Sequence, residues 1–447
     1  GEFLPSGRHR EWCEPGVLKR IRRRTLAKLR GEVAPVESHV LARFLPAWQG
    51  VGVEASGPRR LPQVVEQLEG IPLSFKELER TILPSRVPNF HPRQLDELGA
   101  MGGLVWLGAG SLGGKDGRIA LYRRDRVGLL VDPPPPLEDG GALHEAILDH
   151  LRNRGASFLT EIMATCRDGD EGELLDALWD LVWAGHLTND TFHPIRALEA
   201  PKQKRQRRRR GRGGEVVWAA GGRWSLTEHL LFSRASETEK LHARAMVLLE
   251  RYGIVSREVM SLENFQGGFS PIYQVMKALE ESGKVRRGYF VEGLSGAQFA
   301  YAGAVDQLRA SRQALEAPEV VVLSATDPAN PYGALLSWPE VTAPGAEAAT
   351  TPKRIAGATV IIVNGELLLW LDSSGKRLVT FKPSDETQPE LMLHALAGLK
   401  RVASKRRGKY LRLEKVDGEP ARSSSRLSLF AQAGFSQDYK GLVLEVR

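Results

Sequence analysis

The sequence predicts an α+β protein in which tandem winged-helix modules are followed by a C-terminal β-barrel. A unit of two or three short helices, a glycine-containing turn and a short strand or strand pair recurs three times between residues 36 and 312. From about residue 318 the pattern changes to short strands separated by turn signals. The 447 residues suit about three domains of roughly 150 residues each, and the 42% hydrophobic content is enough to build their cores.

These patterns divide the chain into six segments, with a proline run at residues 133–136 as a stiff spacer. The segments are a basic helical opening segment (1–35), winged-helix module 1 (36–132), winged-helix module 2 (141–198), a basic linker (199–222), winged-helix module 3 (223–312) and a β-barrel domain with one helix (318–447).

Module 1 shows the unit most completely. Helices are predicted at 61–70, 74–83 and 91–100, followed by strands at 103–110 and 117–124 that a glycine-rich turn joins. Ser74 and Glu77 have the spacing of a capping box at the start of the second helix. Three helices closed by a β-hairpin are typical of the winged-helix variant of helix-turn-helix.

Modules 2 and 3 repeat the unit with shorter wings. Module 2 is predicted to have helices at 144–156, 157–166 and from 171, and a minimal wing near residues 187–192. Module 3 is predicted to have helices at 239–253, 256–263 and 270–283, and a wing strand at 284–294. Trp179 and Trp183 lie four apart on an apolar helix face, which favours core packing over base stacking.

The C-terminal part is predicted to be mainly strand. Short β-rich runs with Asn364-Gly365 and Asp417-Gly418 as turn signals surround one helix at 389–406. Several short strands at this spacing indicate a small barrel or sandwich with the helix packed on it.

Positive charge is concentrated in two short runs. Residues 202–212 hold eight basic side chains and residues 400–412 hold seven, without an acid in either. The two runs together carry a charge of +15. Because the net charge of the whole chain is +8, the remaining residues sum to −7. Concentrated positive charge attracts polyanions through counterion release, although one such run alone is equally typical of a solvated linker.

A third basic element is the opening helix at 17–30, whose apolar stripe is surrounded by lysine and arginine. Such a helix can lie on a membrane surface, bind a partner's groove, or dock on another domain with its arginines toward phosphates. Without a second membrane signal we favour docking.

Several protein classes are excluded or disfavoured. Two cysteines, Cys13 and Cys166, cannot form a disulfide scaffold, and the ten histidines show no ligand spacing, so no metal or cofactor is expected. No apolar run is long enough to span a membrane, and we expect a cytoplasmic protein. The nearest candidate for a phosphate loop, residues 109–117, joins two predicted strands and lacks the closing hydroxyl residue, so we interpret it as a hairpin turn.

Longer motifs along most of the chain resemble one protein family. They are residues 12–30, 44–51, 178–197, 267–300, 325–333 and 441–444. In these segments the chain is similar to the C-terminal region of the bacterial large helicase-related (Lhr) proteins. The resemblance implies tandem winged helices and a β-barrel, an architecture similar to a group of DNA glycosylases. It also implies nucleic-acid repair, a self-associating C-terminal half and, as partner, a helicase core elsewhere in the full-length chain.

Polar residues in the longest motifs are the candidates for chemistry. Asp327, Gln298 and Glu292 are candidate catalytic residues, because a glycosylase needs a carboxylate or amide to position water. The alternative for Asp327-Pro328 and Asn330-Pro331 is turn chemistry, and for Glu292 and Gln298 it is loop anchoring. The Gln-x-Gln pair of the related glycosylases does not occur in the sequence.

Basic and aromatic residues in the runs, the opening helix and the third wing are the candidates for nucleic-acid contact: Arg22, Arg23, Arg207, Arg208, Arg286, Arg287, Tyr289, Lys405, Arg406 and Arg407. Three functions remain open. The first is a DNA-binding and oligomerisation module of a repair helicase, and this module favours single-stranded DNA or a single-stranded tail. The second is a DNA glycosylase acting on damaged or uracil-containing single-stranded DNA. The third is a protein-interaction scaffold.

Overall fold

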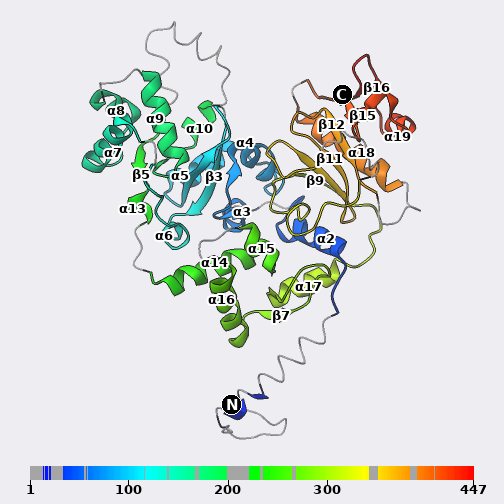
Figure 1. Cartoon of the computed structure of the whole chain (residues 1–447), viewed down its shortest axis with the longest axis horizontal. Helices are drawn as coiled ribbons and strands as arrows, with labels where there is room; N and C mark the ends of the chain where they lie inside the picture. The colour runs from blue at the N-terminus through cyan, green and yellow to red at the C-terminus, as the bar shows by residue number, and fades with distance from the viewer. Residues whose placement is uncertain are drawn as a thin grey trace.

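The computed structural model (Figure 1) describes most of the chain between residues 34 and 446. The described ranges are 34–54, 59–114, 116–137, 140–166, 171–198, 221–231, 235–263, 268–341, 351–382, 390–406 and 408–446, together with residues 14, 16–18, 20, 21 and 57. Helices and strands are mixed throughout the described ranges, which confirms the α+β class. Within these ranges no helix has the length and apolar character needed to cross a membrane.

Module 1 has the predicted helices and hairpin. Its elements are α2 (Ser38–Trp48), α3 (Arg60–Leu68), β1 (Leu73–Ser74), α4 (Phe75–Glu77) continuing into the π-helical turn η1 (Leu78–Ile82), α5 (Pro92–Ala100), β2 (Leu104–Ser111) and β3 (Gly117–Arg123). The strands form a three-stranded sheet of order β1-β3-β2. β2 ends at Ser111, β3 begins at Gly117 and the two strands pair antiparallel, which confirms that the glycine-rich segment belongs to a β-hairpin.

The predicted cap of α4 forms only in part. Ser74 Oγ accepts a hydrogen bond from the backbone N–H of Glu77 at 3.2 Å, as an N-cap should. The Glu77 carboxylate does not return to Ser74; it accepts hydrogen bonds from residues of the C-terminal part of the chain instead. The capping spacing therefore identified the helix start but not the partner of the glutamate.

Module 2 closes its sheet with a strand from beyond the basic linker. It contains α7 (Ala142–Arg154), α8 (Leu159–Thr165), α9 (Glu171–Trp183), β4 (Leu187–Asn189) and α10 (His193–Leu198). β4 pairs antiparallel with β5 (Trp224–Leu226), and α6 (Val127–Leu130) and α13 (Glu228–Leu231) contact each other. The rings of Trp179 and Trp183 stack at 5.1 Å, and Trp179 is buried, which confirms the predicted core packing.

Module 3 is built around a long helix and a short sheet. Its elements are α14 (Glu237–Tyr252), β6 (Ile254–Val255), α15 (Arg257–Leu262), α16 (Phe269–Glu281), β7 (Arg286–Gly288), β8 (Gln298–Ala300) and α17 (Ala302–Ala310), with the sheet order β6-β8-β7. Val36, at the start of module 1, forms a parallel bridge with Val291 just after the wing. α2 then packs its apolar face into the core of module 3.

The C-terminal part contains two sheets with one helix between them. The first sheet has six strands in the order β15-β14-β12-β11-β10-β9 and the second has the order β13-β17-β16. Their elements are β9 (Val320–Ser324), β10 (Thr359–Val363), β11 (Glu366–Leu371), β12 (Arg377–Thr380), α18 (Glu390–Ser404), β13 (Tyr410–Leu413), β14 (Lys415–Val416), β15 (Glu419–Pro420), η2 (Ala421–Ser423), α19 (Leu427–Gln432), β16 (Ser436–Gln437) and β17 (Leu442–Glu445). Asn364 and Gly365 have positive φ angles and form the predicted turn between β10 and β11.

The predicted β-barrel is not confirmed. Among the described strands, β9 and β15 lie at opposite edges of the six-stranded sheet and do not pair, so this sheet stays open. Its two faces are both buried, because Val360 and Trp370 belong to the core shared with α2 and module 3, whereas Ile361 and Leu371 face α18 and the second sheet. Helices cover both faces of the sheet, and the edge formed by β9 lies next to module 1 (Figure 1).

Candidate nucleic-acid interface

A cleft of about 1720 Å³ lies between module 1 and the six-stranded sheet. One wall is the α4–η1 segment of module 1, and the opposite wall is the edge strand β9 with the end of α18. Val320, Val321 and Val322 of β9 line the cleft and are half-buried. β9 is an edge strand of the sheet, and its valines form an apolar part of the cleft lining. Polar side chains of module 1 and of the end of α18 line the cleft beside them.

Basic side chains line both walls of the cleft. Lys76 and Arg80, four residues apart on α4–η1, are exposed on one wall, and Arg401 and Lys405, four apart at the end of α18, are exposed on the other. Residues four apart on a helix share a face, so each pair presents two charges together. Burial, and then the charge of Arg401, lower the pKa of Lys405. This crowding of cations favours an anionic ligand that would balance them.

Two carboxylates in the cleft are held by hydrogen bonds. Glu77 lies at the α4 wall, and its side chain accepts from Ser324 Oγ at 2.5 Å, Thr326 Oγ1 at 2.8 Å and the Gly357 backbone N–H at 2.7 Å. Asp116, after the hairpin turn, accepts from Ser74 Oγ at 2.5 Å and from the Gly117 N–H at 2.9 Å. Glu77 therefore joins module 1 to the sheet across the cleft, whereas Asp116 serves its own hairpin.

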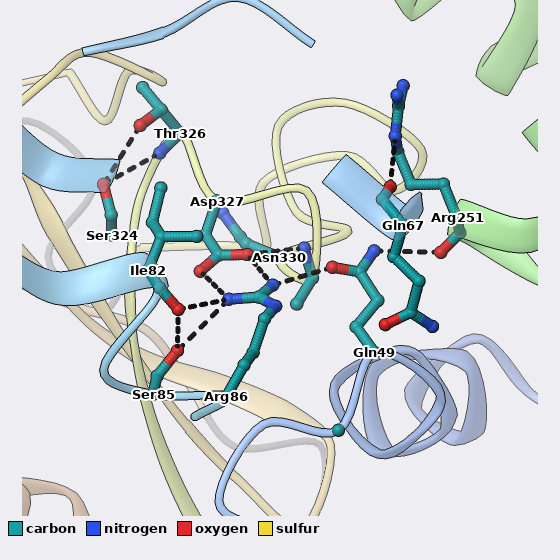
Figure 2. A network of polar contacts seen from close by, with 12 residues as sticks. Gln49, Gln67, Ile82, Ser85, Arg86, Arg251, Ser324, Thr326, Asp327 and Asn330 are labelled. Carbon is teal, nitrogen blue, oxygen red and sulfur yellow. Dashed lines mark hydrogen bonds and ion pairs between the residues drawn. The ribbon is translucent and has the colours of Figure 1, made fainter. Parts of the chain in front are cut away.

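A buried ion pair near the cleft fixes the relative position of its walls (Figure 2). Arg86, just after η1, donates to both carboxylate oxygens of Asp327, from Nη2 at 2.6 Å and from Nη1 at 3.0 Å. Arg86 Nη2 also donates to Gln49 Oε1 at 2.7 Å, and Gln49 Nε2 donates to the carbonyl of Arg251. These contacts connect module 1, α2, module 3 and the segment after β9 in one polar network.

The candidate catalytic residues occupy different places in the structure. Asp327 is 1% exposed, and besides Arg86 it accepts from the Ala329 N–H at 2.8 Å. Asn330 Oδ1 accepts from the Tyr332 N–H at 3.1 Å, so the turn interpretation of both residues is confirmed. Gln298 is 0% exposed. Its Oε1 accepts from the backbone N–H groups of Phe290 and Val291, and its Nε2 donates to the carbonyl of Val291, which confirms loop anchoring. Glu292 is exposed beyond the wing, and none of these side chains lines the cleft.

The basic and aromatic residues of the third wing differ in whether they are exposed or packed inside the module. Arg286 is exposed and lies 3.9 Å from Asp306, and Tyr289 is 63% exposed. Arg287 instead stacks its guanidinium over the rings of Tyr273 and Phe299, at 5.6 and 5.8 Å from their centroids. Arg286 and Tyr289 are therefore accessible to a ligand, whereas Arg287 is used inside the module.

Of the other candidates for nucleic-acid contact, Lys405 and Arg406 line the cleft. Arg406 donates to the Ser374 carbonyl at 3.1 Å, and burial lowers its pKa. Arg22, Arg23, Arg207, Arg208 and Arg407 lie outside the described residues. Among the described residues, no group of three or more histidine, cysteine, aspartate or glutamate side chains is arranged to hold a metal ion.

Sequence reasoning missed the module 1 side of the cleft. Lys76, Arg80 and Glu77 belong to one short helix whose apolar residues, Leu78 and Ile82, face the core. The four-residue spacing of the two cations was the available signal, but two cations on a helix are also the ordinary pattern of a solvated face. Only the position of β9 and α18 opposite this helix distinguishes the two cases.

Comparisons with known proteins agree with this architecture. Residues 36–124 and 234–320 each match the family described as large helicase-related protein, winged-helix domain. The chain is thus a winged-helix protein in at least these two parts. It is 39% identical to the Lhr helicase/probable uracil glycosylase of Mycolicibacterium smegmatis over 87% of this chain and 27% of that protein. It is 35% identical to the Lhr helicase/uracil glycosylase of Escherichia coli over 96% of this chain and 30% of that protein.

The chain is therefore related to the Lhr proteins along most of its length, which confirms the resemblance expected from its motifs. It spans less than a third of the length of these curated relatives. A solved structure, Streptomyces sahachiroi DNA glycosylase AlkZ, aligns with a TM-score of 0.49 and 14% identity, over 83% of this chain and 97% of that one.

Proposed function

We propose that this chain is a DNA-binding part of a helicase-related protein and that DNA lies in the cleft between module 1 and the six-stranded sheet. The observation that carries the proposal is the convergence of Lys76 and Arg80 with Arg401 and Lys405 on opposite walls of one cleft. The match of residues 36–124, which supply one wall of the cleft, and of residues 234–320 to winged-helix domains of the Lhr family supports a nucleic-acid partner.

Single-stranded DNA, or a single-stranded tail, is the form that fits the cleft best. The walls carry cations for phosphates, while the half-buried valines of β9 offer an apolar surface for unstacked bases. A helicase core elsewhere in the full-length chain would deliver such strands. Self-association of this part of the protein, implied by the family resemblance, belongs to the same proposal and is tested by its mass in solution.

The decisive experiment measures DNA affinity against salt concentration. Arg401→Ala with Lys405→Ala should weaken binding of a single-stranded oligonucleotide and reduce the slope of log K against log salt by about 0.7 for each lost phosphate contact. Lys76→Ala with Arg80→Ala should act in the same way from the other wall.

A matched control removes two exposed arginines outside the cleft lining, Arg93 and Arg152. This control should leave affinity and slope unchanged. A scaffold that does not bind DNA would show no salt-dependent binding in any variant, and equal losses in the control and cleft variants would mean that only overall charge matters.

A second function is base release from DNA, and the names of the two relatives favour it. Both are described as helicase and uracil glycosylase or probable uracil glycosylase, and both align with 87% or more of this chain. Free uracil released from a uracil-containing single-stranded oligonucleotide, followed over time, tests this function directly.

A further inference from the structure

Glu77 is a carboxylate set among cations in the cleft. Its residue is 8% exposed, and it shares the α4–η1 wall with Lys76 and Arg80. We propose that Glu77 is the catalytic carboxylate of base release, where it binds and activates the water that hydrolyses the glycosidic bond of a nucleotide held in the cleft. This inference rests on the second function proposed above.

The hydrogen bonds of Glu77 hold its carboxylate in one orientation and leave part of it available. Oε1 accepts from Ser324 Oγ and the Gly357 N–H, and Oε2 accepts from Thr326 Oγ1. A carboxylate has about four lone-pair sites, so these three bonds leave room on Oε2 for one more donor such as water. Groups fixed in this way act without reorganising during the reaction.

The other nearby carboxylates are less suited to this role. Asp327 gives both oxygens to Arg86 and is 1% exposed, so water cannot reach it in this arrangement. Asp116 accepts from Ser74, Gly117 and the backbone of Lys76, all on its own module, and it orders the hairpin turn. Unlike Asp116, Glu77 joins the two walls of the cleft, and unlike Asp327 it lines the cleft, where a nucleotide between the walls would meet it.

The cleft can hold a nucleotide with its flanking phosphates. Its volume of about 1720 Å³ exceeds the roughly 300–1,000 Å³ of ordinary small-molecule sites. Arg401 and Lys405 would bind phosphates on one side and Lys76 and Arg80 on the other, while Val321 and its neighbours contact the extruded base. The acid then lies near the sugar, between the phosphate-binding cations and the apolar wall.

The reaction is a hydrolysis and needs no other reactant. The bond between the sugar C1′ and the base nitrogen breaks, and its electron pair leaves with the base. The oxygen of water forms the new bond to C1′ while Glu77 takes one of the water protons, which then passes to the departing base. The negative charge of Glu77 also stabilises the positive charge that develops on the sugar ring.

The test compares Glu77→Gln with wild type on a uracil-containing single-stranded oligonucleotide under single-turnover conditions. Gln has the same shape and keeps an oxygen to accept from Ser324 and Gly357, so the fold should persist. We expect at least a 100-fold loss of the release rate, because general bases contribute about 10²–10⁴-fold. The dissociation constant for DNA and the melting temperature should change little, and Glu77→Asp should retain more rate than Glu77→Gln.

Two controls separate catalysis from a structural role. Glu97→Gln removes an exposed carboxylate outside the cleft lining and should leave the release rate within a few-fold of wild type. Ser324→Ala with Thr326→Val removes two hydrogen bonds to Glu77 but keeps its charge, so it should cost far less rate than Glu77→Gln. If Glu77 only holds the walls together, the two variants will lose rate and melting temperature in parallel, and the inference is wrong.

Wild-type release rates in Glu77→Gln would also overturn it. So would a wild-type protein that binds the oligonucleotide but releases no uracil. That last result leaves the DNA-binding proposal intact, since that proposal depends on the salt dependence of the cleft variants.

Discussion

Arg86 and Asp327 are 241 residues apart in the sequence, yet their side chains form a two-point ion pair with 0% and 1% exposure. A buried pair of this kind offers little net stability over an apolar pair of the same size, but losing one partner leaves an unpaired charge inside the protein. The ion pair therefore fixes the position of module 1 relative to the segment that follows β9.

Removing one partner of this pair should be costly. We expect Asp327→Ala or Arg86→Ala to lower the free energy of unfolding by about 3–5 kcal/mol, because each leaves a buried charge. Arg86→Met with Asp327→Leu should recover much of that loss. Urea unfolding of the three variants measures the coupling, with Arg93→Ala at the exposed Arg93–Glu97 pair as a control that costs about 0.5 kcal/mol or less. Additive losses in the double variant would show that the two charges do not depend on each other.

The third wing should divide into a binding part and a packing part. Arg286→Ala with Tyr289→Ala should weaken binding of single-stranded DNA, because both side chains are accessible and a stacked base is worth about 1–3 kcal/mol. Arg287→Ala should lower the melting temperature instead, since its guanidinium lies over Tyr273 and Phe299. Titrations and thermal scans of the two variants distinguish these effects. Unchanged affinity in the folded Arg286 and Tyr289 variant would exclude the wing from binding.

His150 should make the stability of module 2 depend on pH. Its Nε2 lies 3.1 Å from Ser157 Oγ, and its buried Nδ1 has no hydrogen-bond partner among the described residues. Burial, and then the charge of Arg154, lower the pKa of His150 below its ordinary value of about 6.5. The unfolded chain then binds a proton near pH 6.5 while the folded chain does not, so stability should fall as the pH drops from 7.5 to 5.5.

Urea unfolding at pH 7.5 and pH 5.5, monitored by tryptophan fluorescence, measures this loss of stability as the difference between the two urea midpoints. His150→Gln should reduce the difference between the two midpoints. An unchanged difference in this variant would assign the pH dependence to other groups.

The sequence predicted local structure well because local structure depends on nearby residues. The helices of modules 1 and 3 begin and end within a few residues of their expected limits, and Asn364-Gly365 forms the expected turn. Hydrophobic periodicity reports the type of an element but not its distant partner. The bridge between Val36 and Val291, the pairing of β4 with β5 across the basic linker, and the open edges of the six-stranded sheet were therefore not foreseen.

The candidate site was predicted only on the side where charge is dense. Lys405 and Arg406 were chosen because seven cations occur within thirteen residues, whereas Lys76 and Arg80 are two cations among acids and apolar residues. Asp327 was chosen for its place in a long motif, and its partner Arg86 has no signal in the sequence that links the two. Long-range pairing of charges depends on the tertiary fold, and for that reason a single sequence does not show it.

The packing of α2 into module 3 has a consequence for how the protein is made. Trp48 Nε1 donates to the carbonyl of Glu250, 202 residues later, and Phe44 shares its core with residues of α14. At about 5–20 residues per second, the ribosome needs roughly 10–40 s to travel from one partner to the other. During that interval the apolar face of α2 has been synthesised and its binding surface has not. The apolar face of α2 is therefore without its packing surface until the third module has been translated.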